Sequence, residues 1–225
     1  MTYRLFGLFL ALLLPATAQE QPASKPGKGS ILVRFLAEQA PESLGQAILV
    51  SGETKSAGFT LPTNYLSEPV AVNQRAIVLK TLEKEIPLCA ITLPEAGSAF
   101  AVVLVTAKPA GFTAIVVRTD DPTFKAGDVF FINRTDKTIL GKLGTTPLII
   151  KAGENVKSRP TGVIDDTYYD IAFATREEQG DKLLSSSRWP ISSNLRSYLF
   201  FFTTAQGRTS FRAVDEHLVP AAAGN

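Results

Sequence analysis

Residues 100–105 have the sequence Phe-Ala-Val-Val-Leu-Val, an unbroken run of apolar and β-branched residues that favour strands. Much later in the chain, residues 198–203 have a similar strand-favouring composition, Tyr-Leu-Phe-Phe-Phe-Thr. Successive side chains of a strand point to opposite faces, and both faces of the second run are apolar. We therefore expect residues 198–203 to form a strand buried on both sides, and residues 100–105 to form a central strand.

Outward from these runs, short apolar segments alternate with turn residues at intervals of roughly 8–12 positions, which is typical of all-β folds. No long stretch has the 3.6-residue periodicity of an amphipathic helix. Residues 79–86 are interpreted as a strand running into a loop, and residues 176–184 are a candidate short helix. The expected strands span residues 31–36, 47–50, 70–72, 76–79, 88–93, 100–105, 112–117, 129–132, 138–143, 147–151, 168–174, 198–203 and 208–214.

Turn residues between neighbouring runs predict which strands pair directly. A tight hairpin is expected across Asn73-Gln74-Arg75. Further hairpins are expected across residues 108–111, Gly144 and residues 205–207, where glycine and short polar residues favour chain reversal. The chain should therefore fold largely through antiparallel neighbours.

Residues 29–119 and 120–219 each contain roughly seven candidate strands, the number found in one immunoglobulin-like β-sandwich. Asp120-Asp121-Pro122 is the best candidate linker between two such lobes. We therefore predict an all-β protein of two small immunoglobulin-like lobes. One larger sandwich is the alternative, since all-β domains often reach this total length. The halves share no alignable repeat, so the sequence does not support duplication.

The first eighteen residues are expected to be an export signal. Arg4 supplies a positive charge, residues 5–14 are almost wholly apolar, and Ala16-Thr17-Ala18 has the small-residue pattern that a signal peptidase cleaves. The apolar run is shorter than the roughly 20 residues that a bilayer span requires. Cleavage before Gln19 would leave a flexible leader to residue 29, whereas residues 220–225 are expected to form a loose tail.

Cysteine content and charge narrow the location and the partners. Cys89 is the one cysteine, so no intramolecular disulfide forms, and we interpret it as a buried apolar residue. An exported chain without disulfides fits a bacterial periplasm or cell exterior. The formal net charge is +2 and the basic residues are dispersed, so the sequence shows no basic cluster of the kind that binds nucleic acid. No second long apolar run follows the signal, so no membrane span is expected after cleavage.

The residues of several common catalytic and metal sites are missing. His217 is the one histidine, no Gly-x-Ser-x-Gly motif accompanies it, and we expect it to be a solvated residue at a strand end. One His and one Cys cannot build a thiolate or imidazole metal site. Phosphate-binding glycine motifs are lacking as well, so no cofactor is expected. Acidic residues that remain conceivable calcium ligands, without an EF-hand spacing, are Asp120, Asp121, Asp165, Asp166 and Asp170.

Aromatic residues supply the one speculative binding site. Trp189 follows Arg188, and Tyr168 and Tyr169 open a predicted strand of the same half of the chain. Aromatic faces stack on the apolar faces of sugar rings or on peptide groups, while an arginine holds polar groups. An exposed ligand platform of Trp189 and Arg188 with Tyr168 or Tyr169 is therefore one interpretation, and packing in an aromatic core is the other.

A broader pattern covers most of the mature chain, and its motifs are residues 127–135, 141–144, 150–154, 187–190, 196–201 and 211–214. It consists of a strand ending in Asn, two small-residue turns, and three later segments rich in aromatic residues. This pattern resembles a group of uncharacterised exported β-sandwich proteins of planctomycete and verrucomicrobial bacteria, and it is similar in architecture to the periplasmic accessory protein of alginate O-acetylation. These resemblances imply export and a two-lobed β-sandwich, and carry over no binding residues.

Three functions remain on the sequence alone. The first is a non-catalytic structural or accessory module of the bacterial envelope that binds a protein partner. The second is a module that binds a polysaccharide through the aromatic residues near Trp189. The third is a hydrolase of low activity that uses two carboxylates across a cleft between the lobes.

Overall fold

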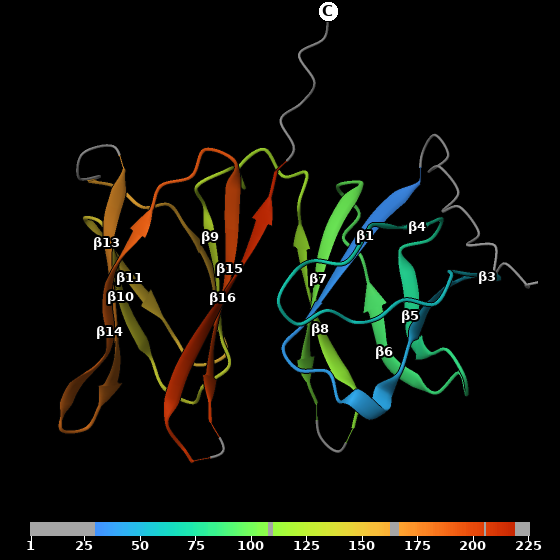
Figure 1. Ribbon diagram of the computed structural model, residues 1–225, viewed down its shortest axis with the longest axis horizontal. Helices are drawn as coiled ribbons and strands as arrows, with labels where there is room; N and C mark the ends of the chain where they lie inside the picture. The colour runs from blue at the N-terminus through green and yellow to red at the C-terminus, as the bar shows by residue number, and fades with distance from the viewer. Residues whose placement is uncertain (1–29, 108–109, 163–166, 205, 219–225) are drawn as a thin grey trace, which may run out of the picture.

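The computed structural model describes residues 30–107, 110–162, 167–204 and 206–218, and they form an almost purely β-stranded protein (Figure 1). A single turn of 3-10 helix, η1 (Glu42–Leu44), is the only helix in these ranges. None of the described residues forms a helix long and apolar enough to cross a membrane. The expected signal (1–18), leader (19–29) and tail (220–225) lie outside the described residues.

The first half of the chain forms two facing sheets of four strands each. The outer sheet 1 has the strand order β3-β2-β5-β6, and the inner sheet 1 has the order β4-β1-β7-β8. The strands are β1 (Ile31–Ala37), β2 (Ala47–Ser51), β3 (Thr54–Lys55), β4 (Val70–Val72), β5 (Ala76–Thr81), β6 (Pro87–Thr92), β7 (Ala99–Thr106) and β8 (Phe112–Arg118).

The second half forms another pair of four-stranded sheets. The inner sheet 2 has the order β12-β9-β15-β16, and the outer sheet 2 has the order β11-β10-β13-β14. The strands are β9 (Val129–Asn133), β10 (Ile139–Leu143), β11 (Thr146–Ile150), β12 (Asn155–Ser158), β13 (Tyr168–Glu177), β14 (Gly180–Pro190), β15 (Leu195–Thr203) and β16 (Thr209–His217). The predicted all-β fold of two sandwich lobes is confirmed.

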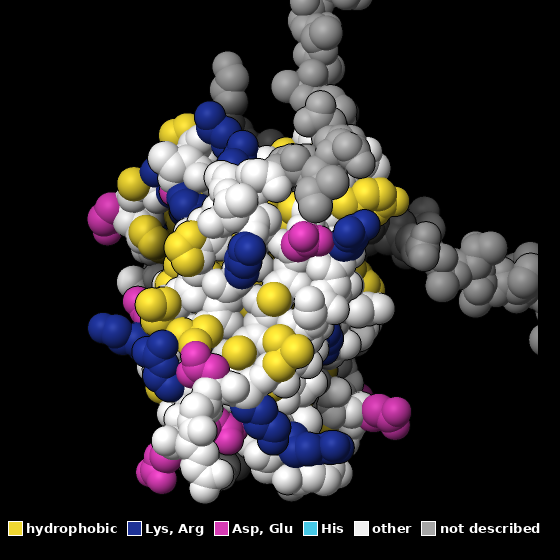
Figure 2. Space-filling model, turned by 90° about the vertical axis from the view of Figure 1, so that its left-hand side faces the viewer, with side chains coloured by type: hydrophobic (Ala, Val, Ile, Leu, Met, Phe, Trp, Pro, Cys, Tyr) yellow, Lys and Arg dark blue, Asp and Glu magenta, His cyan; other side chains and the backbone are white. Residues whose placement is uncertain are grey.

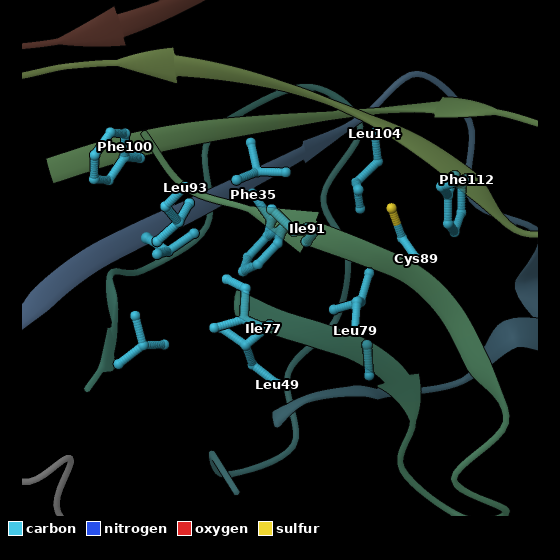
Figure 3. Packing of buried hydrophobic residues seen from close by; sticks show 14 of the residues in the cluster. Phe35, Leu49, Ile77, Leu79, Cys89, Ile91, Leu93, Phe100, Leu104 and Phe112 are labelled. Carbon is cyan, nitrogen blue, oxygen red and sulfur yellow. The ribbon is translucent and has the colours of Figure 1, made fainter. Parts of the chain in front are cut away.

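The four sheets stack as layers, with the two inner sheets face to face (Figure 1). A hydrophobic cluster lies between each pair of adjacent layers, and Figure 3 shows the one inside the first lobe. The cluster between the lobes joins Val103 on the inner sheet 1 to Phe200 on the inner sheet 2. Phe201, the next residue, packs instead into the core of the second lobe. Strand β15 is therefore buried on both faces, as the sequence predicted.

The two lobes share one topology. Each strand of the first lobe has a counterpart eight strands later, in the same sheet position and with the same neighbours. Even the one parallel pair is repeated, because β1 runs parallel to β7 and β9 runs parallel to β15. The sequence did not support a duplication, yet the strand layout is duplicated. The described residues form eight strands in each lobe, and the order of these strands differs from that of a seven-stranded immunoglobulin constant domain.

Two local predictions were wrong. Residues 73–75 do not close a hairpin, because β4 belongs to the inner sheet 1 and β5 to the outer sheet 1. The connection crosses between the sheets, and Ser51 on β2 holds it by donating a hydrogen bond of 2.7 Å to Asn73 and accepting one of 3.1 Å from the backbone of Gln74. Residues 176–184 are not helical, because they form the turn and the flanking strands of the β13–β14 hairpin.

A buried ionic network accompanies the apolar contact between the lobes. The Glu216 carboxylate accepts hydrogen bonds from Arg196 at 2.5 and 3.0 Å and from the Tyr198 hydroxyl at 2.8 Å. Arg34 of the first lobe reaches the same carboxylate at 3.3 Å. Arg212 of the second lobe donates a hydrogen bond of 3.0 Å to the backbone carbonyl of Glu38 in the first lobe. The lobes are thus joined by hydrogen-bonded charges as well as by apolar packing.

Candidate functional site

The aromatic residues singled out from the sequence lie together where β13 begins and β14 ends. The antiparallel register places Tyr169 opposite Trp189, and it places Tyr168 opposite Pro190. Asp170 is opposite Arg188, and their side chains form an ion pair of 3.2 Å. The hairpin therefore brings the start of β13 beside the end of β14, although about twenty residues separate them.

The four predicted platform residues do not share one surface. Tyr169 and Trp189 point between the two sheets of the second lobe, and Tyr169 is only 5% exposed. Tyr168 and Arg188 point to the exterior of the outer sheet 2, where Tyr168 is 48% exposed. This division follows from the alternation of side chains along each strand. No single surface therefore joins all four residues, and the two inward-facing aromatic residues make the candidate site.

A pocket of about 590 Å³ opens where these residues lie, at the end of the second sandwich. Its volume is in the range of small-molecule and sugar sites. Trp189 and Tyr169 supply the aromatic part of the wall. The remaining lining comes from the start of β9 and the connection before it, the end of β14, the connections before β13 and β15, and strands β15 and β16. The residues other than these two are Ala126, Gly127, Asp128, Val129, Arg159, Pro160, Pro190, Ile191, Ser192, Ser193, Leu195, Ser197, Ala213 and Asp215.

One polar side of the pocket is formed by the inner sheet 2. Ser197 on β15 and Asp215 on β16 are direct cross-strand partners, and the Ser197 hydroxyl donates to Asp215 Oδ1 at 2.6 Å. Burial and the negative charge of Asp215 together raise the pKa of Tyr169 to about 12. Tyr169 consequently stays a neutral phenol at physiological pH. The pocket therefore offers a carboxylate acceptor and hydroxyl groups beside an indole ring.

An ion pair holds the part of the pocket wall beside Ser197, whose backbone N–H donates to the carbonyl of Asp128 at 3.1 Å. Arg159 donates to Asp128 Oδ1 at 2.6 Å and to the carbonyl of Ala126 at 2.8 Å. The second carboxylate oxygen of Asp128 accepts the backbone N–H of Lys125 at 2.6 Å. Both oxygens of Asp128 are thus occupied within the protein. This side of the pocket is fixed before any ligand arrives, which lowers the entropic cost of binding.

The corresponding position in the first lobe is filled by buried apolar side chains. Because the two lobes share one topology, β5 and β6 correspond to β13 and β14. Their cross-strand pair in this region is Ile77 and Ile91, and each side chain is 2% exposed in the core of the lobe. The pocket is therefore a property of the residues of the second lobe and not of the shared fold.

Other candidates from the sequence have structural roles. Cys89 lies between Leu104 and Phe112 in the first core, where burial raises the pKa of its thiol, as expected for a buried apolar residue (Figure 3). His217 is exposed at the end of β16. No group of three or more potential metal ligands occurs within the described ranges.

The conceivable calcium ligands are dispersed in ion pairs and turns. Asp120 pairs with Arg118 at 2.7 Å, and Asp121 accepts hydrogen bonds of 2.8 Å from Thr123 within a turn. Asp170 belongs to the exterior ion pair with Arg188. Asp165 and Asp166 lie outside the described residues.

Sequence reasoning missed the polar residues of the pocket. Asp128, Arg159, Ser197 and Asp215 come from four separate segments, and the pairing of β12, β9, β15 and β16 in the inner sheet 2 brings them together. No local motif marks them. No protein-family model and no curated protein sequence matches this chain.

Proposed function

We propose that this chain is a non-catalytic binding module of the bacterial envelope, and that the pocket at Trp189 binds one sugar ring of a glycan. The observation that carries the proposal is the combination of Trp189, Tyr169 and Asp215 in one pocket. A sugar ring has an apolar face that packs on an aromatic ring and hydroxyl groups at its edge that donate to a carboxylate.

The pocket favours binding over hydrolysis. A glycosidase needs two carboxyl groups that both face the substrate, one as acid and one as base or nucleophile. Of the two carboxylates in the lining, Asp128 has both oxygens engaged by Arg159 and by the backbone of Lys125. Asp215 is then the one carboxylate left to meet a ligand in this pocket. The low-activity hydrolase considered from the sequence is therefore not our proposal.

The experiment is a calorimetric titration of the purified chain with a panel of neutral oligosaccharides. We expect Trp189→Ala to weaken binding about tenfold, roughly 1.4 kcal/mol, because the stacking surface is lost. Asp215→Asn keeps the shape of the pocket and removes the charge, and we expect it to weaken binding as well. Tyr168→Ala is the matched control, because Tyr168 neighbours the site in sequence and faces the exterior.

Two results would oppose the proposal. The first is a wild-type chain that binds no member of the panel. The second is a Tyr168→Ala variant that loses as much affinity as Trp189→Ala, since the binding surface would then be the exterior of the outer sheet 2.

A second candidate function is the accessory role with a protein partner, which the sequence favoured. The exterior of the outer sheet 2 supports it, because apolar side chains there stand among charged ones (Figure 2). Ile149 is 58% exposed and Leu183 is 65% exposed on this sheet. Cross-linking in the envelope fraction tests this role. A specific cross-linked partner should be lost with Leu183→Lys and retained with Trp189→Ala.

A further inference from the structure

Strand β14 is the outermost strand of the outer sheet 2, and β13 is its one neighbour in the described part of the chain. It is eleven residues long, and most of its side chains are exposed. An outer strand presents a row of backbone N–H and C=O groups that another strand can pair with. The length and exposure of β14 make its edge a candidate interface.

A β-bulge in β14 sets which side chains share a face. The pairing with β13 shifts between Phe173 and Ala174, so that Leu184 is an extra residue on β14. Before the bulge, Asp181 and Leu183 point to the exterior of the sheet, opposite Arg176 and Ala174. After the bulge, Ser186 and Arg188 point to the exterior, opposite Ala172 and Asp170.

This pattern restricts how β14 pairs with another β14. In an antiparallel pair, residues directly opposite each other lie on the same face of the sheet. One register that crosses the bulge places Asp181 opposite Arg188 of a second copy and Leu183 opposite its Ser186. All four side chains then lie on the exterior face, and the twofold axis repeats both contacts. A bulge usually discourages edge pairing. Here the two bulges lie opposite each other at the twofold axis, so that on either side of the axis exterior-facing residues remain opposite exterior-facing residues.

Charges within one chain extend this match. Asp181 is 3.6 Å from Arg176, and Arg188 is 3.2 Å from Asp170. In the register above, one row across the joined strands consists of Arg176, Asp181, and then Arg188 and Asp170 of the second copy. The charges alternate along that row, and the axis generates a second identical row. The edge is therefore complementary in charge to itself.

We propose that a second copy of this chain pairs its β14 with this edge, antiparallel and about a twofold axis, so that the two outer sheets become one continuous sheet. The two Trp189 pockets would lie on the order of 30 Å apart along the joined strands, at the rise of a β-strand. If the pockets bind sugars as proposed above, the dimer presents two of them to one glycan and gains avidity. The pairing itself does not depend on that function.

The test is sedimentation equilibrium of the purified chain and of two charge variants. The wild-type chain is expected to dimerise reversibly. Asp181→Arg and Arg188→Asp should each raise the dimer dissociation constant by about tenfold or more, because each places like charges opposite each other twice. Glu53→Arg, at an exposed position of the β2–β3 turn, is the control and should leave the constant unchanged.

Mixing the two variants supplies the discriminating result. In a mixed dimer the arginines of one chain face the aspartates of the other at both positions, so association should return when the variants are combined and should weaken at high salt. A monomeric wild-type chain overturns the proposal. So does a dimer that neither variant weakens, or a mixture that stays as weakly associated as each variant alone. Circular dichroism confirms that each variant is folded.

Discussion

Asn133 is fully buried at the end of β9, where its side chain ties together two turns. Its amide nitrogen donates to the carbonyls of Lys137 and Lys151 at 2.8 and 2.9 Å, and its oxygen accepts from the hydroxyl of Thr135 at 2.7 Å. Asn133→Ala should lower the free energy of unfolding by about 2–4 kcal/mol, because buried backbone carbonyls lose their donor. Urea unfolding checks this. Asp136→Ala, an exposed change in the same turn, should cost far less, and equal costs would contradict the assigned role.

Two buried phenols predict a loss of stability in alkali. The pKa of Tyr169 is raised to about 12 by burial and by Asp215, and the pKa of Tyr198 is raised well above its ordinary value by burial and by Glu216. The unfolded chain releases these protons near pH 10, so their contribution is complete below that pH and is lost as the pH rises toward the folded values. Thermal unfolding between pH 9 and about 12 measures the loss.

The matched variant separates this effect from general alkaline unfolding. Tyr169→Phe removes one of the two phenols, so its stability should fall less steeply than that of the wild-type chain above about pH 10. Tyr168→Phe changes an exposed phenol and should leave the slope unaltered. A Tyr169→Phe variant with the wild-type slope would show that burial of Tyr169 does not control the alkaline limit.

At the scale of the element, the β10–β11 turn depends on close backbone approach at Gly144. A β-carbon there would lie 1.7 Å from the carbonyl oxygen of Thr161, and the residue has a φ of +59°. Gly144→Ala should therefore destabilise the chain by several kcal/mol, roughly the sum of steric overlap and left-handed strain. Gly153→Ala is the control, with a φ of +74° and open space around the added carbon. It should cost only about 1 kcal/mol. Chemical denaturation of both variants distinguishes clash from strain.

Most strands were predictable because their apolar runs are bounded by turns. Strands β7 and β15 were evident since burial on both faces demands unbroken apolar sequence. Strand β14 was missed because an exposed outer strand needs no apolar alternation, and its Leu-Leu-Ser-Ser-Ser centre, which carries the bulge, has none. The hairpin predicted at residues 73–75 failed for a different reason, since local turn propensity cannot tell a reversal within one sheet from a crossing between two.

The candidate site was predictable only in part. Trp189 and Tyr169 were named from the sequence, and their inward direction follows once the β13–β14 register is known. Asp215 and Ser197 belong to another sheet, and their place in the pocket depends on how the two sheets of the second lobe stack. Such long-range packing leaves no spacing signal in the chain.

At the scale of the whole molecule, the inner sheets couple the two lobes. The contact between them contains fully buried Leu36 and Phe200 and the network around Glu216. We expect calorimetry to show a single unfolding transition, because neither lobe can unfold without exposing this surface. Two separate transitions would contradict the coupling.

Glu216 provides the variant that tests this contact. Glu216→Gln leaves the buried Arg196 without its counter-charge and removes the partner of the partly exposed Arg34, and it should lower stability by about 3–5 kcal/mol. Glu95→Gln is the control, because Glu95 is 98% exposed in a loose ion pair with Arg75, and it should leave the melting temperature unchanged. Equal melting temperatures for the two variants would show that the network does not hold the lobes together.

The central claim, that the pocket of the second lobe binds a sugar ring, is tested most directly by fluorescence. Trp189 is the one tryptophan of the chain, so its emission reports on the pocket alone. Titration with neutral oligosaccharides should give a saturable change in intensity with a shift to shorter wavelength, and Asp215→Asn should move the midpoint to higher concentration. An emission spectrum that stays constant across a broad panel would contradict the account.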